Sequence, residues 1–409
     1  MKKILILGAG YYYRPVITRL RQAGFHVLAV DRDPAAPGAV FAHEFSPINL
    51  TDRKAVLAYA RQKAIDGIMP VNDFGTRTSA YVCQEMGLIG LSPAAAGAAN
   101  DKGVMRDVWS RDGLEIPQYA VVSSLEELKT ALEEIGFPAV LKPTDCGGAG
   151  RGISVLASDG DIKWAYDFAK PYVENDRFII EKFIPGIELT VETLSLDGKV
   201  HVLAMSDKEK PELRTRVATS LNYPAAISPQ MEERVRDLVC QAVLSIGILN
   251  GMAHTEVMLA DTGPVLIEIG ARGGGGHVFH TCIEAVSGIC APVEFANLIT
   301  GGTVRLPELE KKGCCYRFFN PPHGLLQAVR NVDIARKFPG VLDIGIIKKA
   351  GDEVGNLKNS LFRAGYVVTC GRDRKEAMGI ADQIESLVEF DVIPCPNTLP
   401  PILGMRGNL

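Results

Sequence analysis

Short apolar runs alternate with helical spacing over the first 95 residues. The runs at 3–8 (KILILG), 26–31 (HVLAVD) and 67–71 (GIMPV) predict buried strands, and the stretches 52–63 and 78–86 predict helices. Strands that alternate with helices in this way predict a small parallel sheet built from βαβ units.

Residues 90–100 (GLSPAAAGAAN) predict a linker after this unit, because Pro93 interrupts regular structure and small residues dominate. Beyond it, up to about residue 185, helical and extended patterns are mixed. Helices are expected at 101–111, from Ser124 with Glu127 at capping-box spacing, and near 160–173. Strands are expected at 117–122 (PQYAVV), 138–143 (PAVLKP), 152–157 (GISVLA) and 177–184 (RFIIEKFI).

Hairpin patterns dominate the second half of the chain. One hairpin is predicted to turn at 197–198 (Asp-Gly) and a second around 261–263. The tail from about 303 to 395 adds further strands and one strongly periodic helix at 374–388. The chain is therefore expected to be an α/β protein with a parallel sheet first and antiparallel strands later.

The second hairpin carries the most informative pair of charges. If its turn is centred on Thr262, antiparallel pairing places Glu256 directly opposite Glu268, with Cβ atoms about 5 Å apart. Two carboxylates at that distance repel by roughly 3 kcal/mol at an effective dielectric constant near 20. The alternation of Val265, Ile267 and Ile269 predicts one apolar face opposite Glu268. A cation is therefore expected between the carboxylates, and Mg²⁺ suits such ligands; the alternative is a solvated pair screened by water.

Two glycine-rich segments suggest a site for phosphates. Arg272 follows the second hairpin strand and precedes four glycines and His277, and a guanidinium there can hold a phosphate or a developing oxyanion. The other segment, 141–153 (LKPTDCGGAGRGI), contains four glycines but lacks the ending of a P-loop and leads into a strand. A glycine-rich loop between strands can fold over phosphates as a lid, and Lys142 is placed to reach the same phosphates. The alternatives are a flexible turn and a surface lysine.

The motif Gly8-x-Gly10 lies between an apolar strand and a helical stretch, as in the dinucleotide-binding fingerprint. The third glycine of that fingerprint is replaced by Tyr13, so the motif is incomplete. The nucleotide site is therefore expected elsewhere, and a dinucleotide-dependent oxidoreductase is a lesser alternative.

Composition narrows the class of protein without identifying it. The 409 residues have a net charge of −4, with 44 Lys and Arg against 48 Asp and Glu, so no basic field indicates nucleic acid. No apolar run is long enough for a signal segment or a membrane span, and a cytoplasmic protein is expected. Nine scattered cysteines without a C-x-x-C pair predict buried thiols rather than a zinc site or disulfides.

The order of five motifs resembles the ATP-grasp superfamily, and most closely its carboxylate–amine ligase branch that includes bacterial L-amino acid ligases. The resemblance covers essentially the whole chain. These motifs are NDKGVMRD (100–107), VLKPTDCGGAGRGI (140–153), IIEKFIPGIELTVE (179–192), AHTEVML (253–259) and VLIEIGARGGGG (265–276).

The resemblance implies three domains and an active site between two sheets. It implies an N-terminal Rossmann-like domain at 1–95, a small central lid domain at 96–185 and a C-terminal antiparallel-sheet domain at 186–409. The reaction implied is ADP-forming: ATP phosphorylates a carboxylate, and an amine attacks the acyl phosphate. ATP and one or two Mg²⁺ ions, or Mn²⁺ in their place, are the implied cofactors, small carboxylates and amines the substrates, and a homodimer is a possible assembly; no nucleic acid or membrane partner is implied.

Site residues carry over from the family motifs as follows. Lys102 and Lys142 would contact phosphates, Arg272 would steady the transferred phosphoryl group, and Gly274, Gly275 and His277 would lie beside the carboxylate substrate. The lid would comprise Cys146, Gly147, Gly148, Ala149, Gly150 and Gly152, the adenine hinge Glu181, Phe183 and Ile184, the ribose ligand Glu188, and the metal ligands Glu256 and Glu268. Gly8 and Gly10 would only permit a tight turn near the cleft.

Two departures from the family pattern limit what carries over. Gly270 stands where many members have a metal-binding Asn, which leaves the number of metal ions open. The segment 211–224 (PELRTRVATSLNYP) lacks the family's substrate motif, although Arg214 and Arg216 alternate and could face a carboxylate. The alternatives to amino-acid ligation are purine-synthesis-like ligation, bicarbonate-dependent carboxylation, and a nucleotide-binding regulator without turnover.

Overall fold

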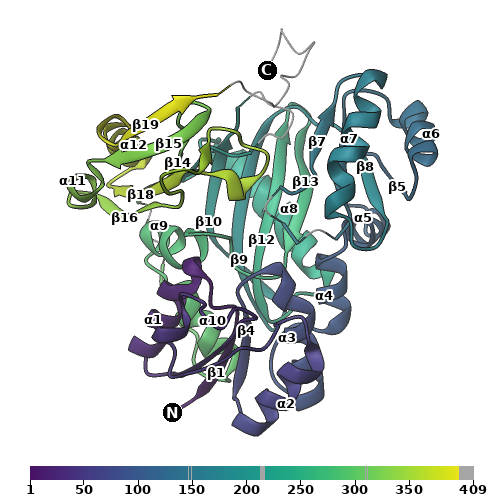
Figure 1. The fold of residues 1–409 in the computed structure, drawn as a ribbon. Helices are drawn as coiled ribbons and strands as arrows, with labels where there is room; N and C mark the ends of the chain where they lie inside the picture. The colour runs from purple at the N-terminus through teal and green to yellow at the C-terminus, as the bar shows by residue number, and fades with distance from the viewer. Residues whose placement is uncertain (146, 149, 212–216, 309, 311, 396–409) are drawn as a thin grey trace.

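The computed structural model describes residues 1–145, 147–148, 150–211, 217–308, 310 and 312–395. Figure 1 shows the N-terminal unit at one end, a small sheet with its helices at one side, and a long antiparallel sheet between them. The three sheets thus follow the order that the sequence pattern predicts: parallel first, antiparallel afterwards.

The N-terminal unit is a four-stranded parallel sheet in the order β3-β2-β1-β4; the parallel sheet was expected from three strands, and its edge strand β3 was not predicted. Burial of the apolar runs explains why these segments form the inner strands of the sheet, because β1 and β2 have four fully buried residues each. Gly8 has a φ of +124°, and a Cβ there would lie 2.9 Å from Asn72 Nδ2. The elements are β1 Lys3–Leu7, η1 Tyr11–Tyr13, α1 Arg14–Gln22, β2 His26–Val30, η2 Ala39–Phe41, β3 Glu44–Ser46, α2 Arg53–Lys63, β4 Gly67–Pro70 and α3 Asp73–Met86.

The predicted linker at 90–100 is wrong, because this segment contains helix α4 (Pro93–Ala99). The Ser92 hydroxyl accepts a hydrogen bond from the Ala95 amide at 3.1 Å, and Pro93 occupies the first turn, where its missing N–H is not needed. Alanine is the strongest helix former, and four alanines of α4 are buried. Proline here marks a helix start.

The central sheet has four strands in the order β5-β8-β6-β7, all antiparallel. Helices α6 and α7 cover it through a core that includes Leu128, Leu132 and Ile162. Its elements are α5 Lys102–Arg111, β5 Tyr119–Val122, α6 Leu125–Ile135, β6 Ala139–Pro143, β7 Ser154–Leu156, η3 Asp159–Asp161, α7 Ile162–Ala169, η4 Lys170–Tyr172 and β8 Phe178–Lys182.

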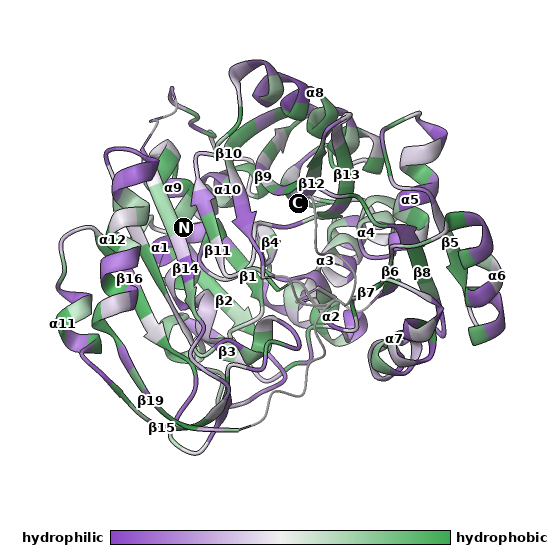
Figure 2. Ribbon diagram, turned by 90° about the horizontal axis from the view of Figure 1, so that it is seen from above, coloured by the Kyte–Doolittle hydropathy of each residue, from purple (hydrophilic) through white to green (hydrophobic). Residues whose placement is uncertain are grey.

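The largest sheet has eight strands in the order β13-β12-β9-β10-β11-β14-β18-β16, and a three-stranded sheet, β17-β15-β19, lies beside its far end. Helix α8, which the sequence description overlooked, packs against β13, β10 and β12. In Figure 2, the peripheral helices α6, α11 and α12 carry hydrophilic and hydrophobic residues in alternating bands. The strands are β9 Ile187–Leu196, β10 Lys199–Glu209, β11 Ser220–Tyr223, β12 Gly251–Ala260, β13 Gly263–Gly270, β14 Gly313–Phe319, β15 Gly324–Arg330, β16 Val341–Ile346, β17 Glu353–Val354, β18 Gly365–Gly371 and β19 Glu389–Pro394. The helices are α8 Pro229–Ile246, η5 Val278–Cys282, α9 Ile283–Ser287, α10 Ala291–Ile299, α11 Val332–Arg336, η6 Ser360–Phe362 and α12 Arg374–Leu387.

The hairpin β12–β13 contains a bulge that the sequence argument did not foresee. Ala260 pairs with Gly263 and Val257 with Leu266, but the register then shifts so that Glu256 pairs with Glu268. Ile267 is the extra residue. The predicted apolar face of Val265, Ile267 and Ile269 is therefore wrong: Leu266 and Ile269 are buried in the core, while Val265 and Ile267 are partly exposed.

No single helix in the described part of the chain is long and apolar enough to cross a membrane. One sharply bent pair of helical segments, Val278–Ser287 with Ala291–Ile299, is long and apolar enough only when the two segments are counted together.

Candidate functional site

Three adjacent strands place a row of carboxylates on one face of the large sheet. Glu256 on β12 pairs with Glu268 on β13 and, on its other side, with Thr190 on β9. On the same face of β9, two residues away in either direction from Thr190, lie Glu188 and Glu192. The predicted opposition of Glu256 and Glu268 is confirmed.

Lysine side chains supply the cations that such a row requires. Lys208 Nζ lies 2.7 Å from Glu188 Oε1 and also contacts Glu256, and Lys102 Nζ lies 3.1 Å from Glu268 Oε1. Burial would raise the pKa of Glu256, but Lys208 and then His254 hold it well below its usual range. Lys210 contacts Glu188 in the same way. Lys208 and Lys102 thus give Glu256 and Glu268 separate ammonium partners, and the Mg²⁺ ion expected between the two carboxylates stays a prediction.

The carboxylates of this row can hold a metal ion only together with ligands from outside the protein. No group of three or more His, Cys, Asp or Glu side chains in the described residues has the geometry of a complete metal cage. Two opposed carboxylates still fit Mg²⁺, because that ion commonly takes one or two carboxylates and completes its shell with water and phosphate oxygens. Glu256 and Glu268 would hold it.

Lys142 belongs to a buried ion-pair network of the central sheet. Its Nζ lies 2.5 Å from Glu181 Oε2, while Arg106 Nη2 on α5 lies 2.6 Å from Glu181 Oε1. Burial would raise the pKa of Glu181, but Arg106 and Lys142 lower it. Glu181 therefore holds both cations in place, a role that the hinge assignment from sequence did not include.

Arg106 also connects the central sheet to the hairpin β12–β13. The same Nη2 donates to the Ile267 carbonyl oxygen at 2.6 Å, at the residue that forms the bulge beside Glu268. Its Nε and Nη1 are buried and find no hydrogen-bond partner within the part of the chain that the structure describes. Of the predicted hinge, Phe183 is buried and donates its backbone N–H to the Pro138 carbonyl oxygen at 3.1 Å, and Ile184 is partly exposed.

The predicted lid loop closes against the N-terminal unit. Gly147, Gly148, Gly150 and Gly152 all have positive φ, between 62° and 79°, which only glycine adopts readily. A Cβ at Gly148 would lie 2.9 Å from Asp73 Oδ2, so this backbone lies against the start of α3. Glycines at these positions let a ligand approach the backbone closely. Cys146 and Ala149 of the predicted lid lie outside the described residues.

Arg272 forms an ion pair with Asp73, with 3.0 Å between Nη2 and Oδ2. Burial would lower the pKa of Arg272, but Asp73 raises it, so the guanidinium stays charged. A Cβ at position 270 would lie 3.0 Å from Arg272 Cζ and 3.1 Å from Asp73 Oδ1. The space that an Asn side chain would need at position 270 is therefore filled by this ion pair.

A buried Glu–His pair joins the carboxylate row to the loop after Arg272. Glu192 is fully buried, contacts His254 Nδ1 and accepts the Gly274 backbone N–H at 3.0 Å. His254 Nε2 in turn lies 3.8 Å from Glu256 Oε1. Burial would lower the pKa of His254, but Glu192 raises it to about 9. Gly274 is thereby fixed relative to Glu256.

His277, predicted to lie near the substrate, is buried in an aromatic cluster. Its ring centroid is 4.4 Å from that of Tyr366, 5.6 Å from Tyr316 and 5.7 Å from Tyr12. Its Nε2 lies 3.4 Å from Asp343 Oδ2. Gly275 has open space around it, and a Cβ at Gly276 would meet the Tyr316 hydroxyl. The loop 273–277 therefore has one open side and one side closed by tyrosines.

Burial lowers the pKa of His277 to about 4, which makes acid stability a test of its environment. Below pH 6.5 the His277 imidazole binds a proton in the unfolded chain but stays neutral in the folded chain. The free energy of unfolding therefore falls by up to about 1.4 kcal/mol per pH unit until pH 4. Between pH 7.5 and 5.5 we expect wild type to lose about 1 kcal/mol more than His277→Gln, measured by urea unfolding. Equal losses would contradict the buried, neutral imidazole.

Arg363 is a cation at this cluster that the sequence did not single out. It stacks 3.3 Å from the ring centroid of Phe318 and donates to the Ala218 carbonyl oxygen at 2.8 Å, but no described carboxylate forms an ion pair with it. Burial lowers its pKa to about 10. Arg214 and Arg216, predicted to face a carboxylate, lie outside the described residues.

Several functional residues were missed because they depend on contacts across the fold. Asp73, Arg106 and Lys208 contact Arg272, Glu181 and Glu256, respectively, each at least 48 residues away in the sequence. The motif NDKGVMRD did contain Arg106, and AHTEVML contained His254, so their presence in family motifs was the available signal.

Comparison with known proteins gives two family matches. A model described as ATP-grasp domain matches residues 107–282, and one described as L-amino acid ligase C-terminal domain 2 matches residues 317–392. The formate-dependent phosphoribosylglycinamide formyltransferase of Paraburkholderia xenovorans is 30% identical over 60% of this chain and 63% of its own length. That of Janthinobacterium is 32% identical over 49% and 51%. The chain thus aligns with about half to two thirds of these relatives.

Two solved structures share the fold at low sequence identity. L-amino acid ligase from Bacillus licheniformis has a TM-score of 0.84 and 19% identity, with 96% of this chain and 99% of that chain covered. Phosphoribosylglycinamide synthetase from Anaerococcus prevotii has a TM-score of 0.75 and 22% identity, with 96% and 100% covered.

Proposed function

Because the chain belongs to the ATP-grasp superfamily, in its carboxylate–amine ligase branch, we propose that it is an ADP-forming ligase. It activates a carboxylate as an acyl phosphate and joins the acyl group to an amine. The observation that carries the proposal is the convergence of Glu256, Glu268 and Arg272 beside the glycine lid.

The ATP phosphates would bind beside the lysines that form ion pairs with the protein's own carboxylates in this structure. Lys102, which pairs with Glu268, and Lys142, which pairs with Glu181, are the ammonium groups that would bind the phosphates. Glu256 and Glu268 would hold Mg²⁺, which would supply neutralisation of phosphate charge, and Lys102 would pair with a phosphate oxygen. Glu188 and Lys208 extend the same row toward the ribose position that the family motif implies.

The chemistry needs positioning rather than a protein nucleophile. A substrate carboxylate oxygen attacks the γ-phosphorus, the bond to the bridging oxygen breaks, and ADP leaves. The amine then attacks the acyl carbon, loses a proton and expels phosphate. Arg272, held by Asp73, would stabilise the charge on the transferred phosphoryl group and on the acyl phosphate.

Amino acids are the proposed substrates. The match to an L-amino acid ligase C-terminal domain over 317–392 supports this, and that segment brings Asp343 and Tyr366 to His277 of the loop 273–277. Arg363, a guanidinium without an ion-pair partner among the described residues, suits a substrate with a free carboxylate.

A second candidate is ligation of formate to a phosphorylated glycinamide, which is what the names of the curated formyltransferase relatives describe. The sequence alignment with part of these relatives favours formate ligation, whereas the match to the L-amino acid ligase C-terminal domain favours amino acids as the substrates.

The deciding measurement is phosphate release from MgATP with pools of the twenty amino acids, each omitted in turn. We expect release that requires one or two particular amino acids, and ligation would be verified by mass spectrometry of the product. A parallel assay supplies formate and glycinamide ribonucleotide. Release only in the second assay would replace the amino-acid assignment, and release in neither would reject both.

A further inference from the structure

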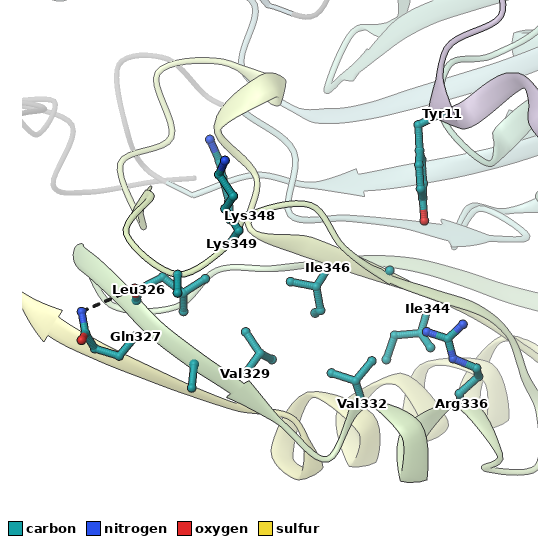
Figure 3. Close-up of a pocket in the computed structure, with 13 residues that line it drawn as sticks. Tyr11, Leu326, Gln327, Val329, Val332, Arg336, Ile344, Ile346, Lys348 and Lys349 are labelled. Atoms are coloured by element: carbon teal, nitrogen blue, oxygen red, sulfur yellow. Dashed lines mark hydrogen bonds between the residues drawn. The ribbon is translucent and has the colours of Figure 1, made fainter. Parts of the chain in front are cut away.

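A hollow of about 520 Å³ lies in the C-terminal part of the molecule, away from the carboxylate row. Figure 3 shows it between β15 and β16, with α11 below and Tyr11 of η1 across from them. None of its lining residues belongs to the predicted nucleotide, metal or substrate positions.

The middle of the hollow is aliphatic. Two sheets and one helix contribute its side chains, so the surface has a fixed shape of the kind that small-molecule sites use. These residues are Leu326 and Val329 on β15, Val332 on α11, and Ile344 and Ile346 on β16.

Both ends of the hollow are cationic. Lys348 and Lys349 lie at one end and Arg336 at the other, with the aliphatic residues between them in Figure 3. No acidic side chain lines the hollow, and none of the three cations has an ion-pair partner within 4 Å among the described residues. The Asp352 side chain accepts the backbone N–H of Lys349, not its ammonium.

A second hollow, at α6 and α7, shows that such a charge imbalance is not general. That hollow, of about 720 Å³, is lined by Lys129 and Lys163 but also by Glu133 and Asp159, and Lys163 forms an ion pair with Asp167. The positive and negative side chains that line this second hollow balance. The first hollow is lined by three positive side chains and no negative one.

We propose that the hollow between β15 and β16 binds a small organic anion with an apolar body. The aliphatic residues would cover the body, and the lysines or Arg336 would pair with the anionic group. Tyr11 lies between this hollow and the candidate active site, because its ring packs edge-on against Tyr12 at 5.5 Å and Tyr12 packs against His277.

The test uses three probes that share one chain and differ in charge: 1-decanesulfonate, 1-decanol and decyltrimethylammonium, below their micellar concentrations. A sulfonate is used so that the probe cannot act as a carboxylate substrate. Calorimetric titration should give a dissociation constant for the sulfonate at least about tenfold lower than for either other probe. The double variant Lys348→Gln, Lys349→Gln should remove that preference, while Lys163→Gln at the second hollow should leave it unchanged.

The substituted lysines lie at the surface and form no ion pair among the described residues, so the variants should fold, as a thermal melt would verify. Equal binding of the sulfonate and the ammonium probe would overturn the proposal. So would a preference that survives the double variant, or one that saturating MgATP abolishes, because the sulfonate would then occupy the nucleotide site.

Discussion

Glu256→Gln should lower phosphate release at least about 1,000-fold, which corresponds to about 4 kcal/mol of lost transition-state stabilisation. The substitution keeps the shape of the side chain but removes the charge that, in the proposed reaction, binds Mg²⁺ opposite Glu268. The amide would also leave Lys208 with Glu188 as its one carboxylate partner at this place. The measurement is steady-state phosphate release at saturating MgATP with the substrates that the pool assay identifies.

The matched control for this change is Asp261→Asn, which removes a carboxylate from the exposed turn of the same hairpin and should leave the rate within about twofold. Circular dichroism and a thermal melt would check that both variants are folded. A Glu256→Gln protein that is folded and retains more than a tenth of the wild-type rate would remove this carboxylate from the metal site. Raising the Mg²⁺ concentration should not restore the rate.

Arg272→Lys should lower kcat by about 100- to 1,000-fold with a much smaller change in the KM for ATP. Lysine keeps the positive charge and can still pair with Asp73, but it lacks the planar fork that binds two oxygens at once. The loss should therefore fall on the transition state rather than on binding of the nucleotide. Single-turnover kinetics of phosphoryl transfer would measure it directly.

The variant Asp73→Asn separates the contribution of the Arg272 guanidinium from that of the carboxylate that holds it in place. That variant keeps Arg272 but removes the charge that holds it, so we expect a smaller loss than in Arg272→Lys. If Arg272→Lys is nearly as active as wild type, the guanidinium does not contact the transferred phosphoryl group. If Asp73→Asn is the more damaged of the two, Asp73 has a role in addition to holding Arg272.

The sequence predicted those parts of the site that depend on strand periodicity and on motifs. The opposition of Glu256 and Glu268 followed from one hairpin turn. The predicted pairing near the turn was one residue out of register, and the bulge at Ile267 restores the predicted pairing of the two glutamates. Gly147, Gly148, Gly150 and Gly152 were recognised as a loop because glycine clusters stand out locally. Periodicity and composition are local properties, and they sufficed for these features.

The parts that sequence did not predict are contacts between distant segments. Arg106 bonds to Glu181 and to the Ile267 carbonyl oxygen, which are 75 and 161 residues away in the chain. No local pattern indicates which acid a buried arginine will meet. The helix at 93–99 was not predicted for a different reason: proline was interpreted as a helix breaker, although in the first turn of a helix it is favourable.

The bulge at Ile267 also limits how this hairpin can change its length during evolution. Insertion of one residue into the turn would move every following pair by one position and turn Glu268 to the opposite face, away from Glu256. Such an insertion preserves the pair only if the bulge residue is lost at the same time. Because that residue's carbonyl oxygen is the acceptor for Arg106, its loss would also remove the hydrogen bond by which Arg106 of α5 contacts the hairpin. Relatives that keep this arginine contact should therefore vary in turn sequence but seldom in turn length.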